Sequence, residues 1–186
     1  MKHMKSGFCC TCVIAMLLLS IFTGCGSDNN NDNGTGPGGS VAFLSDNANP
    51  GPNSVTLRQQ SATSSSLILD VAMVQVQNVY GAAFEIRYPS GVIRYTGYAS
   101  GDFLSGDGAP VSIQVAENPA GVLIIGATRL GDAGGINGSG NLLSLRFEPV
   151  ATGSGRVDFQ NASLRDPNNN IIPGVNFLGG SVSVVM

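Results

Sequence analysis

The 186-residue chain contains one histidine and two lysines, and all three lie within its first five residues. They are Lys2, His3 and Lys5. Because no histidine follows, a Ser-His-Asp triad, a Cys-His pair or a histidine metal site cannot form in the rest of the chain. The scarcity of these residues argues against an enzyme, and it predicts neither a cofactor nor a metal ion.

The first 24 residues have the pattern of an export signal. Two lysines precede an apolar stretch over 8–22, and at about 15 residues this stretch is shorter than the roughly 20 that a membrane-spanning helix needs. It ends in Thr23, Gly24 and Cys25, which resembles the lipobox of bacterial lipoproteins, where the cysteine is acylated and becomes the new N-terminus. We expect 1–24 to be a lipoprotein signal peptide and Cys25 to carry lipid. An ordinary secretory signal is the alternative.

The resemblance to lipoproteins also implies a location. Gly26, not aspartate, follows the acylated cysteine. In Gram-negative lipoproteins this favours the outer membrane over the inner one, so the chain is expected to be exported and lipid-anchored to the cell envelope. Residues 25–40, rich in Gly, Asn and Asp, have no apolar side chain to bury and are predicted to be a flexible linker.

Cysteine and positive charge are both scarce after the predicted cleavage site. Cys9, Cys10 and Cys12 lie in the signal segment, so only Cys25 remains and no disulfide can form within the mature chain. The chain after that site contains seven arginines and twelve acidic residues, so the net charge of its side chains is −5. This charge gives no basic patch for nucleic acid, and no nucleic-acid function is predicted.

Residues 41–186 are long enough for one domain, and their apolar residues follow the period of β-strands. The clearest alternation places one set inward, namely Tyr80, Ala82, Phe84, Ile86 and Tyr88. The opposite set faces water, namely Gly81, Ala83, Glu85 and Arg87. No stretch has sustained helical spacing. The domain is therefore predicted to be all-β.

About nine strands are expected, separated by turn residues roughly every 8–12 positions, which is typical of a β-sandwich. They are predicted near 41–45, 66–76, 79–88, 92–98, 110–117, 121–128, 141–149, 155–160 and 176–185. The runs 67–76 and 122–127 are apolar on both parities and predict strands covered on both faces. Residues 55–59 predict a tenth, peripheral strand.

The order and spacing of these motifs resemble a cohesin domain over essentially all of 41–186. The resemblance begins with Gly81, Phe84, Ile86 and Tyr88. It continues through Val92-Ile93, Gly101 to Leu104, Gly121 to Gly126, Gly135-Ile136, Gly138 to Leu142, Leu145 and Phe147, Val157 and Phe159, and Leu164 to Asp166. It implies a nine-stranded jelly-roll sandwich that binds a dockerin module. Such modules typically assemble polysaccharide-degrading enzymes at a bacterial surface.

The resemblance also implies which face a partner would use. On the family's usual sheet, the candidate partner-binding residues are Gly81, Ala83, Glu85, Arg87, Ser112 and Gln114. Two departures stand out: Pro89 follows Tyr88 where the family has Asp-Pro, and Gly81 and Ala83 replace polar residues of well-known dockerin-binding cohesins. A dockerin that needs those polar groups would not find them here. Glu85 and Arg87 are equally explained as ordinary solvated charges.

Other functions fit the sequence less well. A carbohydrate-binding sandwich is the main alternative, but it would need exposed aromatic rings, there is no tryptophan, and Tyr98 is the best candidate. The aspartates at 102, 107 and 132 are attributed to turns rather than to a glycosidase pair, and Asp166 to an Asx turn. A structural lipoprotein without a dedicated ligand is the remaining alternative.

Overall fold

The structure is a computed structural model, and it describes residues 39–186. In this part the chain forms eleven β-strands and one short 3-10 helix, η1 (Phe103–Ser105). The strands are β1 (Ser40–Ser45), β2 (Ser54–Ala62), β3 (Leu67–Val79), β4 (Gly81–Arg87), β5 (Ile93–Ser100), β6 (Val111–Glu117), β7 (Val122–Arg129), β8 (Ile136–Pro149), β9 (Gly153–Arg165), β10 (Asn176–Leu178) and β11 (Gly180–Val185). Among these residues no helix has the length and apolar character to cross a membrane.

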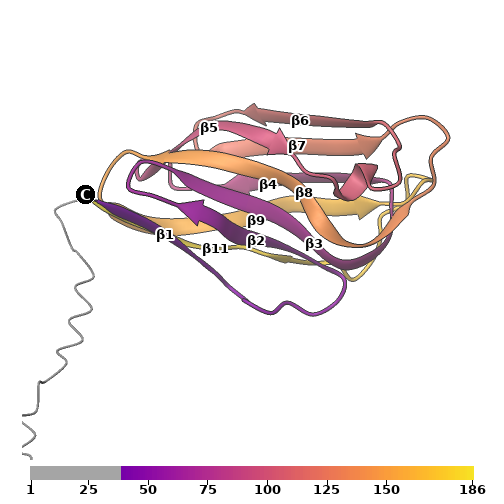
Figure 1. The fold of residues 1–186 in the computed structure, drawn as a ribbon, viewed down its shortest axis with the longest axis horizontal. Coiled ribbons are helices and arrows are strands. Elements are labelled where there is room, and N and C mark those ends of the chain that lie inside the picture. Colours follow the sequence, from indigo (N-terminus) through magenta and orange to yellow (C-terminus); the bar gives the residue numbers. More distant parts are fainter. Residues whose placement is uncertain (1–38) are drawn as a thin grey trace, which may run out of the picture. The chain divides into compact units, whose positions relative to one another are not determined.

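The strands form two sheets that pack face to face (Figure 1). One sheet has six strands in the order β1-β11-β9-β4-β7-β6, and the other has five in the order β10-β2-β3-β8-β5. All neighbouring strands are antiparallel except β10, which pairs in parallel with β2. The predicted all-β jelly-roll sandwich is therefore confirmed.

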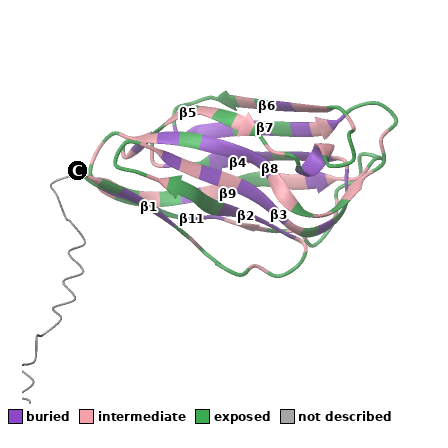
Figure 2. Cartoon of the chain, in the orientation of Figure 1, coloured by how far each residue is buried: buried purple, intermediate pink, exposed green. Residues whose placement is uncertain are grey.

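The core lies between the two sheets and is built from the alternating residues that the sequence placed inward (Figure 2). Of the five residues predicted to lie inward in the β4 region, Ala82, Phe84, Ile86 and Tyr88 are buried, whereas Tyr80 is half-buried. Opposite them, Phe147 of β8 has no exposed surface and its ring lies 5.2 Å from the ring of Tyr88, edge to face. Such pairs add to the burial of apolar area, which is the main driving force for the fold.

Eleven strands occur instead of nine for two reasons. The run at 55–59 is not peripheral, because Val55 and Leu57 of β2 are fully buried and β2 lies between β10 and β3. The predicted strand 176–185 divides at Gly179 into β10 and β11, which belong to different sheets. A side chain at Gly179 would lie 2.4 Å from the carbonyl oxygen of Val157, so the crossing needs a glycine.

The prediction that two strands are covered on both faces is wrong. In the described part only two sheets pack together, so no third layer covers the outer face of either run. On β7 the outward Ile124 is 48% exposed and Gly126 is exposed as well, although both lie in the apolar run 122–127. On β3 the outward Asp70 is half-buried by neighbours of its own sheet.

Candidate functional site

The six predicted partner-binding residues lie together on the outer face of the six-stranded sheet. Strand pairing places Ser112, Thr128 and Gly81 in one row across β6, β7 and β4. The next row consists of Gln114, Gly126 and Ala83. The structure thus brings the predicted residues side by side, while their role in binding stays a prediction. Gly81 was predicted to face water, but it is buried between its neighbours on β7 and β9.

The centre of this surface is flat and apolar. Next to the row of Gly126 and Ala83 lies a row of Ala116, Ile124 and Glu85. We call the surface the β4/β7 face, formed by Gly81, Ala83, Glu85, Arg87, Ser112, Gln114, Ala116, Ile124, Gly126 and Thr128. An exposed isoleucine among small residues is the arrangement expected at the centre of a protein interface, with polar groups around it.

Charged groups border one end of the face. The Glu85 carboxylate accepts a hydrogen bond from the Asn161 side chain at 2.9 Å, and it lies 3.8 Å from the Arg87 guanidinium. Arg87 is half exposed, whereas the Glu85 side chain is 25% exposed. Glu85 is therefore held in place by its neighbours, and Arg87 is free to rearrange against a partner.

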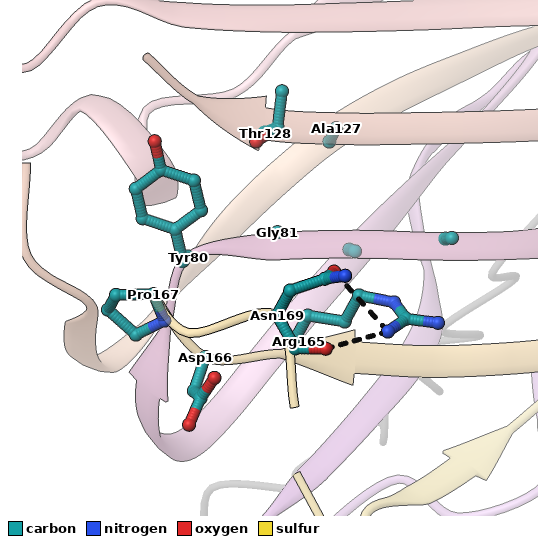
Figure 3. Close-up of a pocket in the computed structure, with 10 residues that line it drawn as sticks. Tyr80, Gly81, Ala127, Thr128, Arg165, Asp166, Pro167 and Asn169 are labelled. Carbon is teal, nitrogen blue, oxygen red and sulfur yellow. Dashed lines mark hydrogen bonds between the residues drawn. The ribbon is translucent and has the colours of Figure 1, made fainter. Parts of the chain in front are cut away.

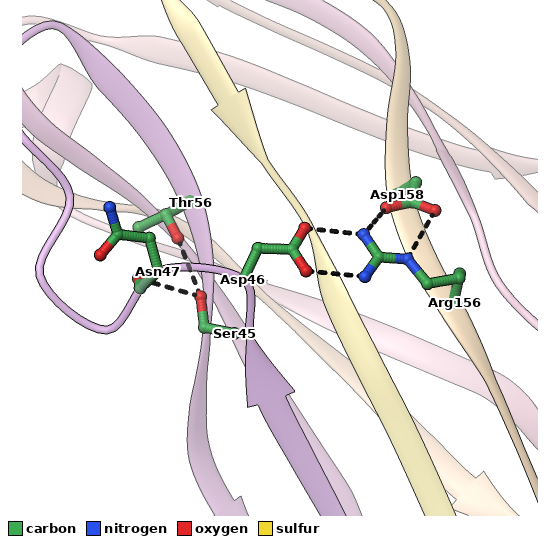
Figure 4. Close-up of polar contacts among 6 residues, drawn as sticks. All are labelled: Ser45, Asp46, Asn47, Thr56, Arg156 and Asp158. Atoms are coloured by element: carbon green, nitrogen blue, oxygen red, sulfur yellow. Dashed lines mark hydrogen bonds and ion pairs between the residues drawn. The ribbon is translucent and has the colours of Figure 1, made fainter.

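Further along this end, Arg156 of β9 joins two aspartates (Figure 4). Its guanidinium donates two hydrogen bonds of 2.7 Å to the Asp46 carboxylate, just beyond β1, and others to Asp158. The hydrogen bond from Arg156 is the main reason that the pKa of Asp46 lies below its usual range. The cluster links the end of β1 to β9 across β11.

We expect Arg156→Met to lower the melting temperature at pH 7 by about 1–3 °C, since solvent-exposed ion pairs contribute roughly 0.2–1 kcal/mol. The pKa of Asp46 is lower in the folded than in the unfolded chain. The contribution of its carboxylate to the stability of the fold is therefore complete at pH values above the unfolded pKa of about 4. It is lost as the pH falls through the lower folded-state pKa.

Thermal unfolding of the unaltered chain and of Arg156→Met between about pH 7 and pH 2 measures the difference in melting temperature, which should shrink at the acid end. Arg87→Met is the matched control, because Arg87 is equally exposed and has one contact of 3.8 Å. A fall in melting temperature for Arg156→Met that is the same at all these pH values would contradict the stabilising role of the Arg156–Asp46 pair.

A pocket of about 280 Å³ lies at the opposite end of the β4/β7 face (Figure 3). Its floor is formed by Gly81 and Ala83 of β4, and Thr128 of β7 lies on one side. The other residues that line it are Tyr80, Ala82, Ala127, Arg165, Asp166, Pro167 and Asn169. The register of β4 and β9, which pairs Gly81 with Arg165, brings the turn that follows β9 to this site.

The turn after β9 holds its own aspartate, as the sequence predicts. The Asp166 carboxylate accepts hydrogen bonds from the backbone N–H groups of Asn168 and Asn170, at 2.9 and 2.8 Å. The bond from the Asn170 backbone is the main reason that the pKa of Asp166 is lowered. The Asx turn is confirmed, and it directs this carboxylate away from Gly81 (Figure 3).

Tyr98, the candidate for sugar stacking, joins the two sheets at their edges. Its ring is 37% exposed, and its hydroxyl donates a 3.0 Å hydrogen bond to the carbonyl oxygen of Ile113 on β6. Among the described residues it is the one aromatic residue that is exposed rather than buried or half-buried. A single ring of this kind does not form a platform.

Sequence reasoning missed a buried cation. Arg129, at the end of β7, is 1% exposed and donates hydrogen bonds to the Leu104 carbonyl oxygen and to Asp107. The bond from Arg129 is the main reason that the pKa of Asp107 is lowered. The inward parity of Arg129 on β7 was a signal for this contact. Asp107 therefore forms an ion pair with Arg129 in addition to its place in a turn.

Ile124 and the Arg165 pocket were missed as well. The outward parity of Ile124 is visible in the sequence, but the apolar run around it predicts a strand covered on both faces. The pocket depends on the pairing of β4 with β9, which no local pattern encodes. Cys25, the signal peptide and the linker up to residue 38 lie outside the described residues.

Comparison with known proteins identifies the type of sandwich. No protein-family model matches the chain, and no curated protein matches its sequence. Among solved structures, the second type II cohesin module of the adaptor ScaA scaffoldin of Acetivibrio cellulolyticus is similar, with a TM-score of 0.55 and 14% identity. The match covers 77% of this chain and 88% of that one.

Two further structures agree. A non-cellulosomal cohesin from the archaeon Archaeoglobus fulgidus has a TM-score of 0.50 and 17% identity, covering 75% of this chain and 88% of that chain. A chain of a type II cohesin–X-dockerin complex from Acetivibrio cellulolyticus has a TM-score of 0.53 and 12% identity, covering 75% and 94%. The chain has a cohesin-like fold, as the resemblance of its sequence implied.

Proposed function

We propose that this chain is a non-catalytic interaction module that docks a dockerin-like protein module on its β4/β7 face. The observation that carries the proposal is an uncovered, small-residue sheet face on a cohesin-like sandwich, with exposed Ile124 at its centre. One of the similar structures is itself a complex of a cohesin with a dockerin. The departures at Gly81 and Ala83 favour a partner that packs closely on the backbone over one that needs polar side chains there.

The dimensions of the face suit such a partner. Its three strands, β4, β6 and β7, lie about 4.8 Å apart and are each about seven residues long at about 3.4 Å per residue, which makes a plate of roughly 14 by 24 Å. A partner that also covers the neighbouring strand β9 and the surrounding loops reaches toward the roughly 800 Å² per partner of a standard interface. The small side chains in the centre allow close packing, and the charges of Glu85 and Arg87 lie at the edge, where water remains.

The test is a binding titration of the full chain, purified in detergent, against each dockerin module encoded in the same genome. A one-to-one complex with a dissociation constant of about 10 µM or tighter supports the proposal. Lack of binding to every such module, or a genome that encodes none, would overturn it.

We also propose that the chain is exported and held at the cell envelope, at the outer membrane, by lipid on Cys25. The docked partner is then a secreted protein, in our proposal an enzyme of polysaccharide breakdown, retained near the surface. The motif around Cys25 supports this anchoring. Metabolic labelling with a radioactive fatty acid tests it, since Cys25→Ala should lose the label, and an unlabelled unaltered chain would refute the anchor.

A further inference from the structure

The pocket at the end of the β4/β7 face has an apolar floor and one uncommitted positive group. Gly81 and Ala83 of β4 line the floor. The Tyr80 ring and Pro167 lie at one end, beside Gly81 (Figure 3). The Tyr80 hydroxyl donates to the carbonyl oxygen of Gly131 at 3.1 Å. A guest side chain therefore meets mainly carbon on these sides.

Arg165 supplies the charge of this pocket. One of its terminal nitrogens, Nη1, donates to the backbone oxygen of Asn169 at 2.8 Å, which fixes the guanidinium alongside β4 (Figure 3). Among the described residues Arg165 has no carboxylate within ion-pair distance. The guanidinium is thus anchored by one nitrogen, and its remaining donors are available to a ligand.

The negative charge nearest in sequence does not neutralise this group. Asp166 also lines the pocket, but its two oxygens accept hydrogen bonds from Asn168 and Asn170. Its carboxylate points away from Gly81 in Figure 3. A carboxylate brought in from outside would therefore be attracted to Arg165, and Arg–carboxylate pairs are among the stronger hydrogen-bonded contacts.

We propose that this pocket receives an acidic side chain of the docked module, with its carboxylate on Arg165 and its methylene stem on Gly81 and Ala83. The inference rests on the proposed function, and it adds the chemistry of one anchor residue on the partner. A cavity of about 280 Å³ accommodates a glutamate or aspartate side chain together with part of the partner's backbone.

The test uses a dockerin module that binds the unaltered chain. Arg165→Met keeps the apolar stem and removes the charge, and it should weaken binding about tenfold. The loss should shrink as the salt concentration rises from about 0.05 to 0.5 M, because added ions screen the pair. Arg165→Lys, which keeps the charge, should lose less than Arg165→Met.

Each exposed acidic residue of the docked module is then changed singly to its amide. One of these variants should lose affinity about as strongly, with no further loss when it is combined with Arg165→Met. The matched control is Arg146→Met, because Arg146 is exposed on β8 of the other sheet and has no ion pair among the described residues. It should bind as the unaltered chain does.

The outcomes separate the two proposals. If the unaltered chain binds no dockerin, the docking function fails, and this inference fails with it. If the unaltered chain binds, and Arg165→Met binds equally well while melting at the same temperature, only the acidic anchor is refuted. Loss of affinity without coupling to any acidic residue of the partner would also refute it.

Discussion

Gly126→Leu is expected to weaken docking by at least about a hundredfold while leaving the melting temperature unchanged. Gly126 lies in the central row of the β4/β7 face, between Ala83 and Gln114. A Cβ atom built at Gly126 meets no atom within 4 Å, and its backbone does not have the positive φ that demands glycine. The leucine would project outward, where the partner has to approach most closely.

Shape complementarity explains the size of this effect. The proposed partner packs on a plate whose centre consists of glycine, alanine and one isoleucine. A new side chain there holds the two surfaces apart over much of their area, and disruption at the centre of an interface commonly costs about 2–4 kcal/mol. The fold should not lose stability, because the leucine replaces a glycine, whose strand propensity is low, at a position where the added side chain meets no atom.

Gly51→Leu is the matched control for this variant. Gly51 is exposed in the loop between β1 and β2, and a Cβ atom there also meets nothing within 4 Å. The same chemical change off the face should leave affinity unaltered. Calorimetric titration and thermal unfolding of both variants give the two readouts. If the affinity of Gly126→Leu were within about threefold of that of the unaltered chain, docking would have to use another surface.

The sandwich was predictable because inward and outward residues alternate along single strands. Phe84 and Ile86 lie inward and Ala83 and Arg87 outward, and this local parity is enough to place the β4/β7 face on the outside. The alternation does not tell which residues of a strand face solvent when both of its faces are apolar. The prediction that a second layer covers Ile124 is wrong, because a sequence does not show whether another layer packs over an apolar residue.

Pairing between distant strands was not predictable in the same way. Gly81 lies beside Arg165 because β4 pairs with β9, which is more than 60 residues further along the chain. The pocket exists only through that register. The division of 176–185 likewise depends on the space available at Gly179, next to Val157 of β9. Both features are set by contacts between segments rather than within them.

Phe147→Ala is expected to destabilise the domain by about 3–5 kcal/mol, the usual cost of deleting a buried phenylalanine ring. Phe147 lies on β8, has no exposed surface, and packs edge to face with Tyr88 at 5.2 Å and Tyr95 at 6.0 Å. The cavity would open at the point where the two sheets meet. For a domain of this size, the melting temperature should fall by about 10–15 °C.

This variant complements Gly126→Leu because it separates folding from docking. Phe147 lies in the core and Gly126 on the surface, so Phe147→Ala should still bind a dockerin at 25 °C, provided that the domain remains folded at that temperature. Phe177→Ala is the control, since Phe177 is half-buried on the three-residue strand β10 and should cost clearly less. Thermal unfolding by circular dichroism measures both losses. If Phe147→Ala melted within about 3 °C of the unaltered chain, the packing of the two sheets around this ring would be wrong, and the position of the β4/β7 face would have to be reconsidered with it.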